Sequence, residues 1–201
     1  MRIDTIRLRS WLGWLGMLLP WIVVALVGYF PESISATYFT NAGTVFMIIL
    51  GAASILLMCY KGYEKIDDIT LTAAGIFGLG ICLFPTWTSD EEYIGTFMLQ
   101  RDLSSTLHLI CAVVFFGLLA YNSIFLFTKG DGQPTKKKKI RNVIYIVSGI
   151  GMIASFLLIL LPDFSIKIWL IETIALFFFG LSFLTKADIY PFLFCDTPFK
   201  D

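Results

Sequence analysis

The sequence predicts an all-α, polytopic membrane protein: one bundle of six transmembrane helices with both termini in the cytoplasm. Three observations support this fold class. The 201-residue chain is 57% hydrophobic and only 15% charged, whereas soluble domains carry about 25% charged residues. Six apolar segments are long enough to cross a bilayer as helices, which takes about 20 residues. Finally, the basic residues are distributed very unequally between the two sides of these segments.

The six predicted spans form a single domain that covers residues 1–201. They are residues 11–30, 42–60, 69–87, 103–127, 143–161 and 166–184. The first apolar run is too long for the core of a signal peptide, so we expect it to be retained as a span. Pro20 lies in the middle of this span, where it removes a backbone hydrogen bond and favours a kink. Glycines recur in the other spans, and small residues allow transmembrane helices to pack closely.

The charge distribution predicts the orientation. With the N-terminus in the cytoplasm, 13 of the 15 basic residues fall on the cytoplasmic side. Only Arg101 and Lys167 fall on the other side. Because basic residues favour cytoplasmic connections, both termini should be cytoplasmic, and the acidic 90–92 loop should be external. We therefore expect an integral, multi-pass protein of a plasma or inner membrane.

Composition disfavours several other classes of site. The four cysteines show no C-x-x-C spacing, so we expect buried thiols rather than a zinc or redox site. A disulfide between Cys82 and Cys111 remains open. A single histidine is too few for the usual zinc hydrolase, and we predict no metal and no cofactor. The basic run at residues 136–139 is a topology signal that can also attract anionic lipid, and it does not indicate a nucleic-acid partner.

One candidate site stands out, because two ionisable residues lie inside predicted spans. At 1.5 Å per residue, His108 should lie about 7 Å and Glu172 about 9 Å below the external ends of their helices. Ionisable groups inside a membrane usually face the bundle interior or water, and they pair. We therefore expect an outward-facing polar pocket formed by His108, Glu172, Ser33, Ser35 and Glu32. A histidine–carboxylate bond that only locks two helices is the alternative.

Three functions fit this pocket. The first is a protein that binds or organises lipid, or a membrane partner, through the outward-facing polar pocket. The second is a membrane-embedded lipid hydrolase or transferase that uses His108 and Glu172 as acid and base, or a triad that adds Ser33 or Ser35. The third is an oligomeric channel or transporter. The expected partners are membrane lipids, together with a membrane-protein partner or further copies of the chain.

Short motifs also resemble one family. They are PESISATYFTNAGTVF after the first span, TLHLICAVVFF at the start of the fourth, and WLIETIALFFFGLSFLTK in the sixth. The chain resembles the DRAM and Frag-type membrane proteins and similar uncharacterised bacterial six-span proteins. The shared positions are Ser33-Ile34-Ser35, His108, and Glu172 followed by Phe179-Gly180. The resemblance implies six helices and cytoplasmic termini, with links to autophagy, signalling and lipid-anchor remodelling in eukaryotic members. It implies no reaction and no catalytic residues.

Overall fold

A computed structural model describes residues 5–86, 91–130 and 135–187. This part of the chain contains six α-helices: α1 (Thr5–Val27), α2 (Gly43–Met58), α3 (Lys65–Leu83), α4 (Arg101–Tyr121), α5 (Lys136–Ser155) and α6 (Lys167–Lys186). Helix α4 continues into a π-helical turn, η2 (Asn122–Leu126), and α5 continues into a 3₁₀ turn, η3 (Phe156–Leu160). The α1–α2 connection contains a short 3₁₀ helix, η1 (Ser35–Phe39), and the α3–α4 connection contains a hairpin of β1 (Tyr93–Ile94) and β2 (Leu99–Gln100).

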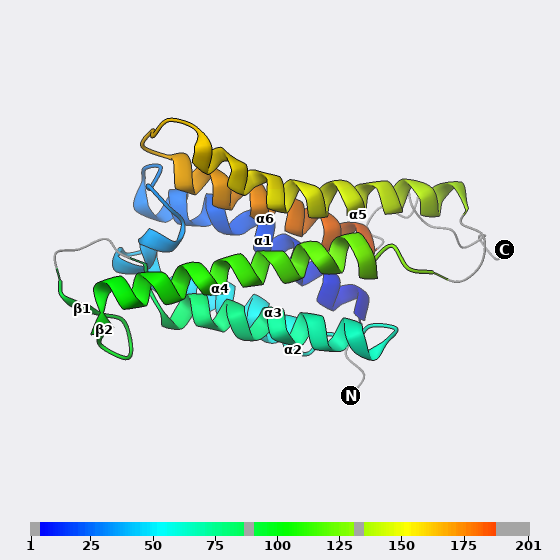
Figure 1. Ribbon diagram of the computed structural model, residues 1–201, viewed down its shortest axis with the longest axis horizontal. Helices are drawn as coiled ribbons and strands as arrows, with labels where there is room; N and C mark the ends of the chain where they lie inside the picture. The colour runs from blue at the N-terminus through cyan, green and yellow to red at the C-terminus, as the bar shows by residue number, and fades with distance from the viewer. Residues whose placement is uncertain (1–4, 87–90, 131–134, 188–201) are drawn as a thin grey trace.

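The helices form a closed ring. Each one packs against the next along the chain, and α6 returns to pack along α1 (Figure 1). Two glycines allow the close approach of α1 and α6. A Cβ atom on Gly180 would lie 2.7 Å from the backbone oxygen of Gly13, and one on Gly13 would lie 3.0 Å from the backbone oxygen of Gly180. The first and last helices are therefore in backbone contact, as expected for small residues between transmembrane helices.

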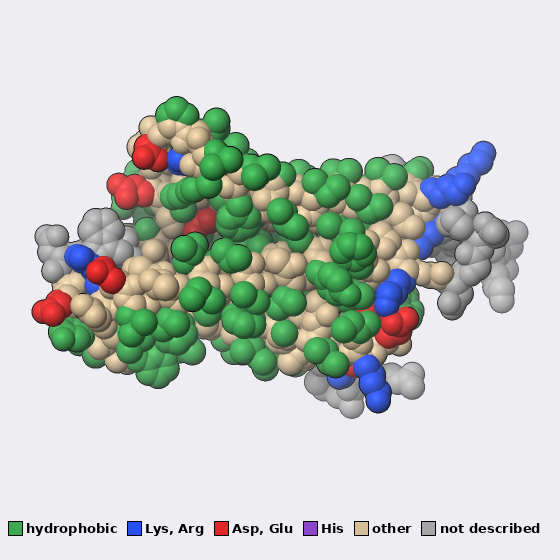
Figure 2. All heavy atoms as spheres, viewed as in Figure 1, with side chains coloured by type: hydrophobic (Ala, Val, Ile, Leu, Met, Phe, Trp, Pro, Cys, Tyr) green, Lys and Arg blue, Asp and Glu red, His purple; other side chains and the backbone are tan. Residues whose placement is uncertain are grey.

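The two ends of the bundle differ in charge. We call one the basic end: here α1 begins, α6 ends, and the α2–α3 and α4–α5 connections lie (Figure 1). Of the 13 lysines and arginines among the described residues, 11 belong to this end. The other, the hairpin end, carries the β1–β2 hairpin, η1 and the α5–α6 turn, with Arg101 and Lys167 as its basic residues. Figure 2 shows blue side chains gathered at the basic end and hydrophobic side chains covering the flank between the ends.

Five helical segments are long and apolar enough to cross a membrane: α1, α3, α4 with η2, α5 with η3, and α6. Helix α2 is also apolar, but it has only 16 residues. The expected all-α bundle is therefore present, and each predicted span overlaps one helix.

The helix boundaries differ from the predicted spans for identifiable reasons. Helix α1 ends at Val27, three residues early, because Gly28 adopts a φ of +81° that a helix cannot continue. Helix α3 begins at Lys65 instead of residue 69, because Glu64 and Asp67 form a reciprocal capping box. Helix α5 begins at Lys136 instead of residue 143, because the Thr135 side chain caps the backbone N–H of Lys138.

The core at the basic end is aromatic, and the Lys186 side chain lies within it. The Phe127 ring centroid lies 5.5 Å from that of Tyr145 and 5.1 Å from that of Phe183. The ammonium nitrogen of Lys186 lies 5.0 Å from the Phe127 centroid and donates a hydrogen bond to the Phe127 carbonyl, at 3.3 Å. A cation above aromatic faces is attracted by the ring quadrupole. Lys186 thus ties the end of α6 to the residue that follows η2.

An ion pair joins the two connections at the basic end. Lys129 Nζ, in the α4–α5 connection, donates to Glu64 Oε2 at 2.7 Å, next to the start of α3. The hydrogen bond to Glu64 raises the pKa of Lys129 above its ordinary value. The pair is exposed to solvent, so we expect it to contribute little to stability.

Candidate functional site

The predicted site residue with the most hydrogen bonds is Glu172, which lies in the second turn of α6. Its carboxylate accepts hydrogen bonds from the Ser33 hydroxyl at 3.2 Å and from the Ser35 hydroxyl at 3.0 Å. It also accepts a short hydrogen bond from the backbone N–H of Ile34. The structure therefore brings together Glu172, Ser33 and Ser35, as the sequence predicts, and we call these residues and Ile34 the Glu172 cluster.

The local backbone explains why these donors converge. Ile34 is the residue that precedes η1, and the first N–H groups of a helix have no partner within the helix. The Glu172 carboxylate takes the place of a capping side chain at this position. Ser33 also stabilises the turn, because its hydroxyl oxygen accepts a hydrogen bond from the Ala36 N–H at 3.2 Å.

A backbone hydrogen bond reinforces the same contact. The Trp169 N–H, at the start of α6, donates to the Glu32 carbonyl at 2.9 Å. The Glu32 side chain itself is exposed. Glu32, one of the predicted pocket residues, therefore contributes to the contact with α6 through its backbone carbonyl. Its carboxylate does not belong to the Glu172 cluster.

The hydrogen bonds of the Glu172 cluster hold two parts of the fold together. Three donors of the chain itself bond to the Glu172 carboxyl group. Ser33 and Ser35 are both buried. The Glu172 cluster thus fixes the α1–α2 connection onto α6.

His108 makes a different contact from the one expected. Its Nδ1 lies 2.7 Å from the Phe84 carbonyl, at the end of α3. Because a carbonyl only accepts, Nδ1 must carry the proton. One turn earlier in α4, the Ser104 hydroxyl donates to the Pro85 carbonyl at 2.9 Å. Both side chains satisfy carbonyls that the end of α3 leaves without helical partners, so His108 locks α4 to α3.

The expected meeting of His108 and Glu172 is not found. The hydrogen bonds of His108 and of Glu172 go to separate elements, and no hydrogen bond or ion pair joins the two side chains within residues 5–86, 91–130 and 135–187. Matched depth along two helices does not determine the direction in which each side chain points. A triad of serine, His108 and Glu172 is likewise not assembled, because the imidazole bonds to a backbone carbonyl.

The remaining candidates for reactive or metal-binding groups are isolated. Cys59, Cys82 and Cys111 are free thiols, so the disulfide left open between Cys82 and Cys111 is not formed. In the described ranges, no three histidine, cysteine, aspartate or glutamate side chains lie close enough together to hold a metal ion.

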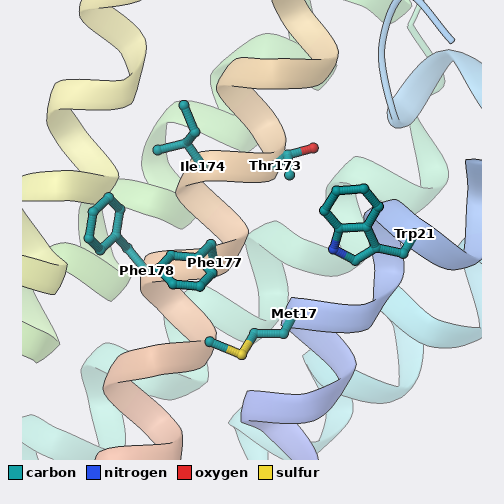
Figure 3. A pocket seen from close by; sticks show the side chains of 6 residues that line it. All are labelled: Met17, Trp21, Thr173, Ile174, Phe177 and Phe178. Atoms are coloured by element: carbon teal, nitrogen blue, oxygen red, sulfur yellow. The ribbon is translucent and has the colours of Figure 1, made fainter. Parts of the chain in front are cut away.

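Sequence reasoning missed a groove on the flank of the bundle, between α1 and α6. It has a volume of about 370 Å³ and is lined by Met17, Trp21, Thr173, Ile174, Phe177 and Phe178 (Figure 3). Thr173 directly follows Glu172. Its hydroxyl is shielded and has no hydrogen-bond partner among the residues that the structure describes, and Figure 3 shows it directed toward the side on which Trp21 lies. The lining residues are ordinary for a membrane span, so their types give no signal of a groove.

Buried polar groups deeper in the bundle were also missed. Ser123, in η2, donates to the Tyr145 carbonyl and lies 2.7 Å from the Ser182 hydroxyl oxygen, which joins η2, α5 and α6. Asn122, beside it, is fully buried, and neither polar atom of its amide has a hydrogen-bond partner in the described ranges. The only signal in the sequence is a pair of polar residues within an apolar span.

Comparisons of the chain with protein-family models, with curated proteins and with solved structures find no match in any of the three. The resemblance to the DRAM and Frag-type proteins therefore stays a prediction that rests on residues 33–35, His108 and Glu172.

Proposed function

We propose that this chain is an integral membrane protein that crosses the bilayer six times, with both termini in the cytoplasm. Five apolar segments of sufficient length support this proposal. Helix α2, about 24 Å long at 1.5 Å per residue, connects the hairpin end to the basic end and packs along α1 and α3. Large apolar side chains face outward on the flank, among them Trp11, Ile48 and Leu157, each more than 60% exposed. The basic end then faces the cytoplasm.

Labelling of introduced cysteines tests this topology. Glu92 and Lys136 are both exposed and lie at opposite ends of the bundle. In a background that lacks the four native cysteines, Glu92→Cys should react with a membrane-impermeant maleimide on intact cells. Lys136→Cys should react only after the cells are lysed. Equal labelling of both positions on intact cells would contradict the orientation.

We further propose that the protein binds membrane lipid at the hairpin end of its α1–α6 face. The observation that carries this proposal is the groove beside the Glu172 cluster, because its volume lies within the range of about 300–1,000 Å³ typical of small-molecule sites. The Glu172 cluster holds the α1–α2 connection on α6 at this end. A binding role fits this geometry better than catalysis, because His108 and Glu172 each stabilise a separate helix end.

Retention of lipid by the purified protein tests the binding role. In native mass spectrometry with phosphatidylcholine added to the detergent micelle, the wild-type chain should retain bound lipid. Ile174→Trp, which fills the groove, should lower the number of retained lipids. Ile48→Trp adds the same side chain to an exposed position of α2 and should leave retention unchanged. Loss of all lipid from the wild type, or equal retention by Ile174→Trp, would count against the proposal.

A further inference from the structure

We infer that the groove between α1 and α6 binds a glycerolipid by one ester-linked acyl chain, with the ester carbonyl held between Thr173 and Trp21. This inference rests on the proposed lipid-binding function and specifies the chemical group that is recognised.

The polar groups of the groove lie at one level. Thr173 precedes Phe177 by four residues on α6, which runs from the hairpin end to the basic end. Trp21 follows Met17 by four residues on α1, which runs the opposite way. At 1.5 Å per residue, Thr173 and Trp21 therefore lie about 6 Å nearer the hairpin end than Phe177 and Met17, the apolar lining residues about one turn away on the same helices. The groove is therefore polar on the side of the hairpin end and apolar on the side of the basic end. A lipid of the outer leaflet has its polar and apolar parts in the same order.

The polar level offers hydrogen-bond donors. Figure 3 shows the indole nitrogen of Trp21 facing the groove from α1, and the Thr173 hydroxyl extending from α6 toward the same space. An indole N–H is a donor only, and a hydroxyl can donate or accept. The Thr173 oxygen has no hydrogen-bond partner within the described part of the chain. An ester carbonyl, which only accepts, complements both groups.

The surroundings favour a lipid as the source of that acceptor. The groove opens on the flank of the bundle, where Trp21 and Phe177 are about half exposed. Within a membrane, water is scarce at this depth, and an unpaired hydroxyl is unfavourable. Below the polar level the lining consists of Met17, Phe177 and Phe178, which suit a hydrocarbon chain. The Trp21 ring makes an edge-to-face contact with Trp169, at 5.8 Å between centroids, which holds it in position beside the groove.

The test compares an ester lipid with its ether analogue on the full-length protein. Phosphatidylcholine and a dialkyl ether analogue with the same headgroup and chain lengths differ only in the carbonyl groups. In native mass spectrometry titrations, the wild type should bind the ester lipid about three- to tenfold more tightly, which is the effect of about one hydrogen bond. Thr173→Val, which is nearly isosteric, should reduce this preference, because it removes one of the two donors to the ester carbonyl.

Matched controls make the result specific. Trp21→Phe should also reduce the ester preference. Thr106→Val should leave the ester preference unchanged, because Thr106 is exposed on α4 and its hydroxyl bonds to its own helix. Trp14→Phe should also leave it unchanged, because Trp14 lies nearer the basic end of α1.

Three results would overturn the inference. The first is equal affinity of the wild type for the two lipids, and the second is an ester preference in Thr173→Val as large as that of the wild type. The third is rapid disulfide dimerisation of Thr173→Cys, which would make the groove an interface between two copies. Equal binding of both lipids would leave the proposed lipid-binding function standing. Failure of the wild type to bind either lipid would remove both.

Discussion

The Oε1 atom of Glu172 lies 3.0 Å from the Oγ atom of Ser35, although 137 positions separate the two residues in the sequence. This contact places a carboxylate of the last helix at the first N–H groups of η1. At the end of α3 the donor and acceptor roles are reversed, because there the imidazole N–H of His108 donates to a backbone carbonyl. In both cases a side chain of one helix satisfies backbone groups at the end of another helical element. These two contacts, together with the glycine contact of α1 and α6, lead to four predictions.

Glu172→Ala should lower the free energy of unfolding by about 1–3 kcal/mol, because it leaves three donors of the α1–α2 connection without their acceptor. Glu172→Gln keeps one acceptor oxygen and should cost less. Unfolding in mixed detergent–SDS micelles measures both. Glu32→Gln is the matched control, since the Glu32 side chain is exposed, and it should change stability by less than about 0.5 kcal/mol. An effect of Glu32→Gln equal to that of Glu172→Gln would contradict the assignment.

The effects of His108→Phe and Glu172→Gln should be additive. His108→Phe keeps a ring of similar size but leaves the Phe84 carbonyl unpaired, which should cost about 1–3 kcal/mol. Because the two side chains share no partner, the double variant should equal the sum of the single variants within about 0.5 kcal/mol. A coupling energy above about 1 kcal/mol would show that the two residues form one site, as the sequence alone suggests.

Gly180→Ala should destabilise the protein by about 1–3 kcal/mol. The added Cβ would lie 2.7 Å from the Gly13 carbonyl oxygen and 2.5 Å from the Met17 Cγ atom. Gly117→Ala is the matched control, since a Cβ there meets nothing within 4 Å, and alanine has the higher helix propensity. Gly117→Ala should therefore be neutral or stabilising in the same unfolding assay. A neutral Gly180→Ala would mean that α1 and α6 do not approach as closely as described.

Lys186→Met should destabilise the basic end by about 0.5–2 kcal/mol, because it keeps the aliphatic stem but removes the cation above Phe127 and the hydrogen bond to its carbonyl. Lys65→Met, at an exposed position at the start of α3, is the control and should have a smaller effect. Thermal unfolding of the purified variants gives the comparison. Equal loss in both variants would point to net charge rather than to the aromatic contact.

The sequence predicts the helices better than their ends. Hydropathy locates every α-helix, but Arg7 and Arg9 lie within α1, outside its predicted span. Arg9 is accommodated there because its Nε donates to the Tyr60 hydroxyl at 3.0 Å and its guanidinium reaches the Lys186 carbonyl. Such tertiary partners have no local pattern. The cap at Thr135, by contrast, uses a preferred N-cap residue and could have been read from the sequence. The Glu64–Asp67 pair has the spacing of a capping box but not its usual residue types.

The candidate site is predicted in part for a related reason. The depth of Glu172 correctly places it near Ser33 and Ser35, because helical rise converts residue number into depth. Depth does not say in which direction around the helix axis a side chain points, so the partner of His108 is not predicted. That partner is a backbone carbonyl, which every residue possesses, and nothing in the identity of Phe84 marks it. The groove escapes prediction for the same reason, since it depends on how two helices face each other.

The closure of the ring by α6 has a consequence for biogenesis. During synthesis the α1–α2 connection emerges early, whereas Glu172 emerges only when about six-sevenths of the chain has been made. Until then the donors of residues 33–35 have no carboxylate, and the face of α1 that carries Gly13 has no neighbour. The hairpin end of the bundle therefore matures last, and a nascent chain that stops short of residue 172 lacks the carboxylate that fixes the α1–α2 connection.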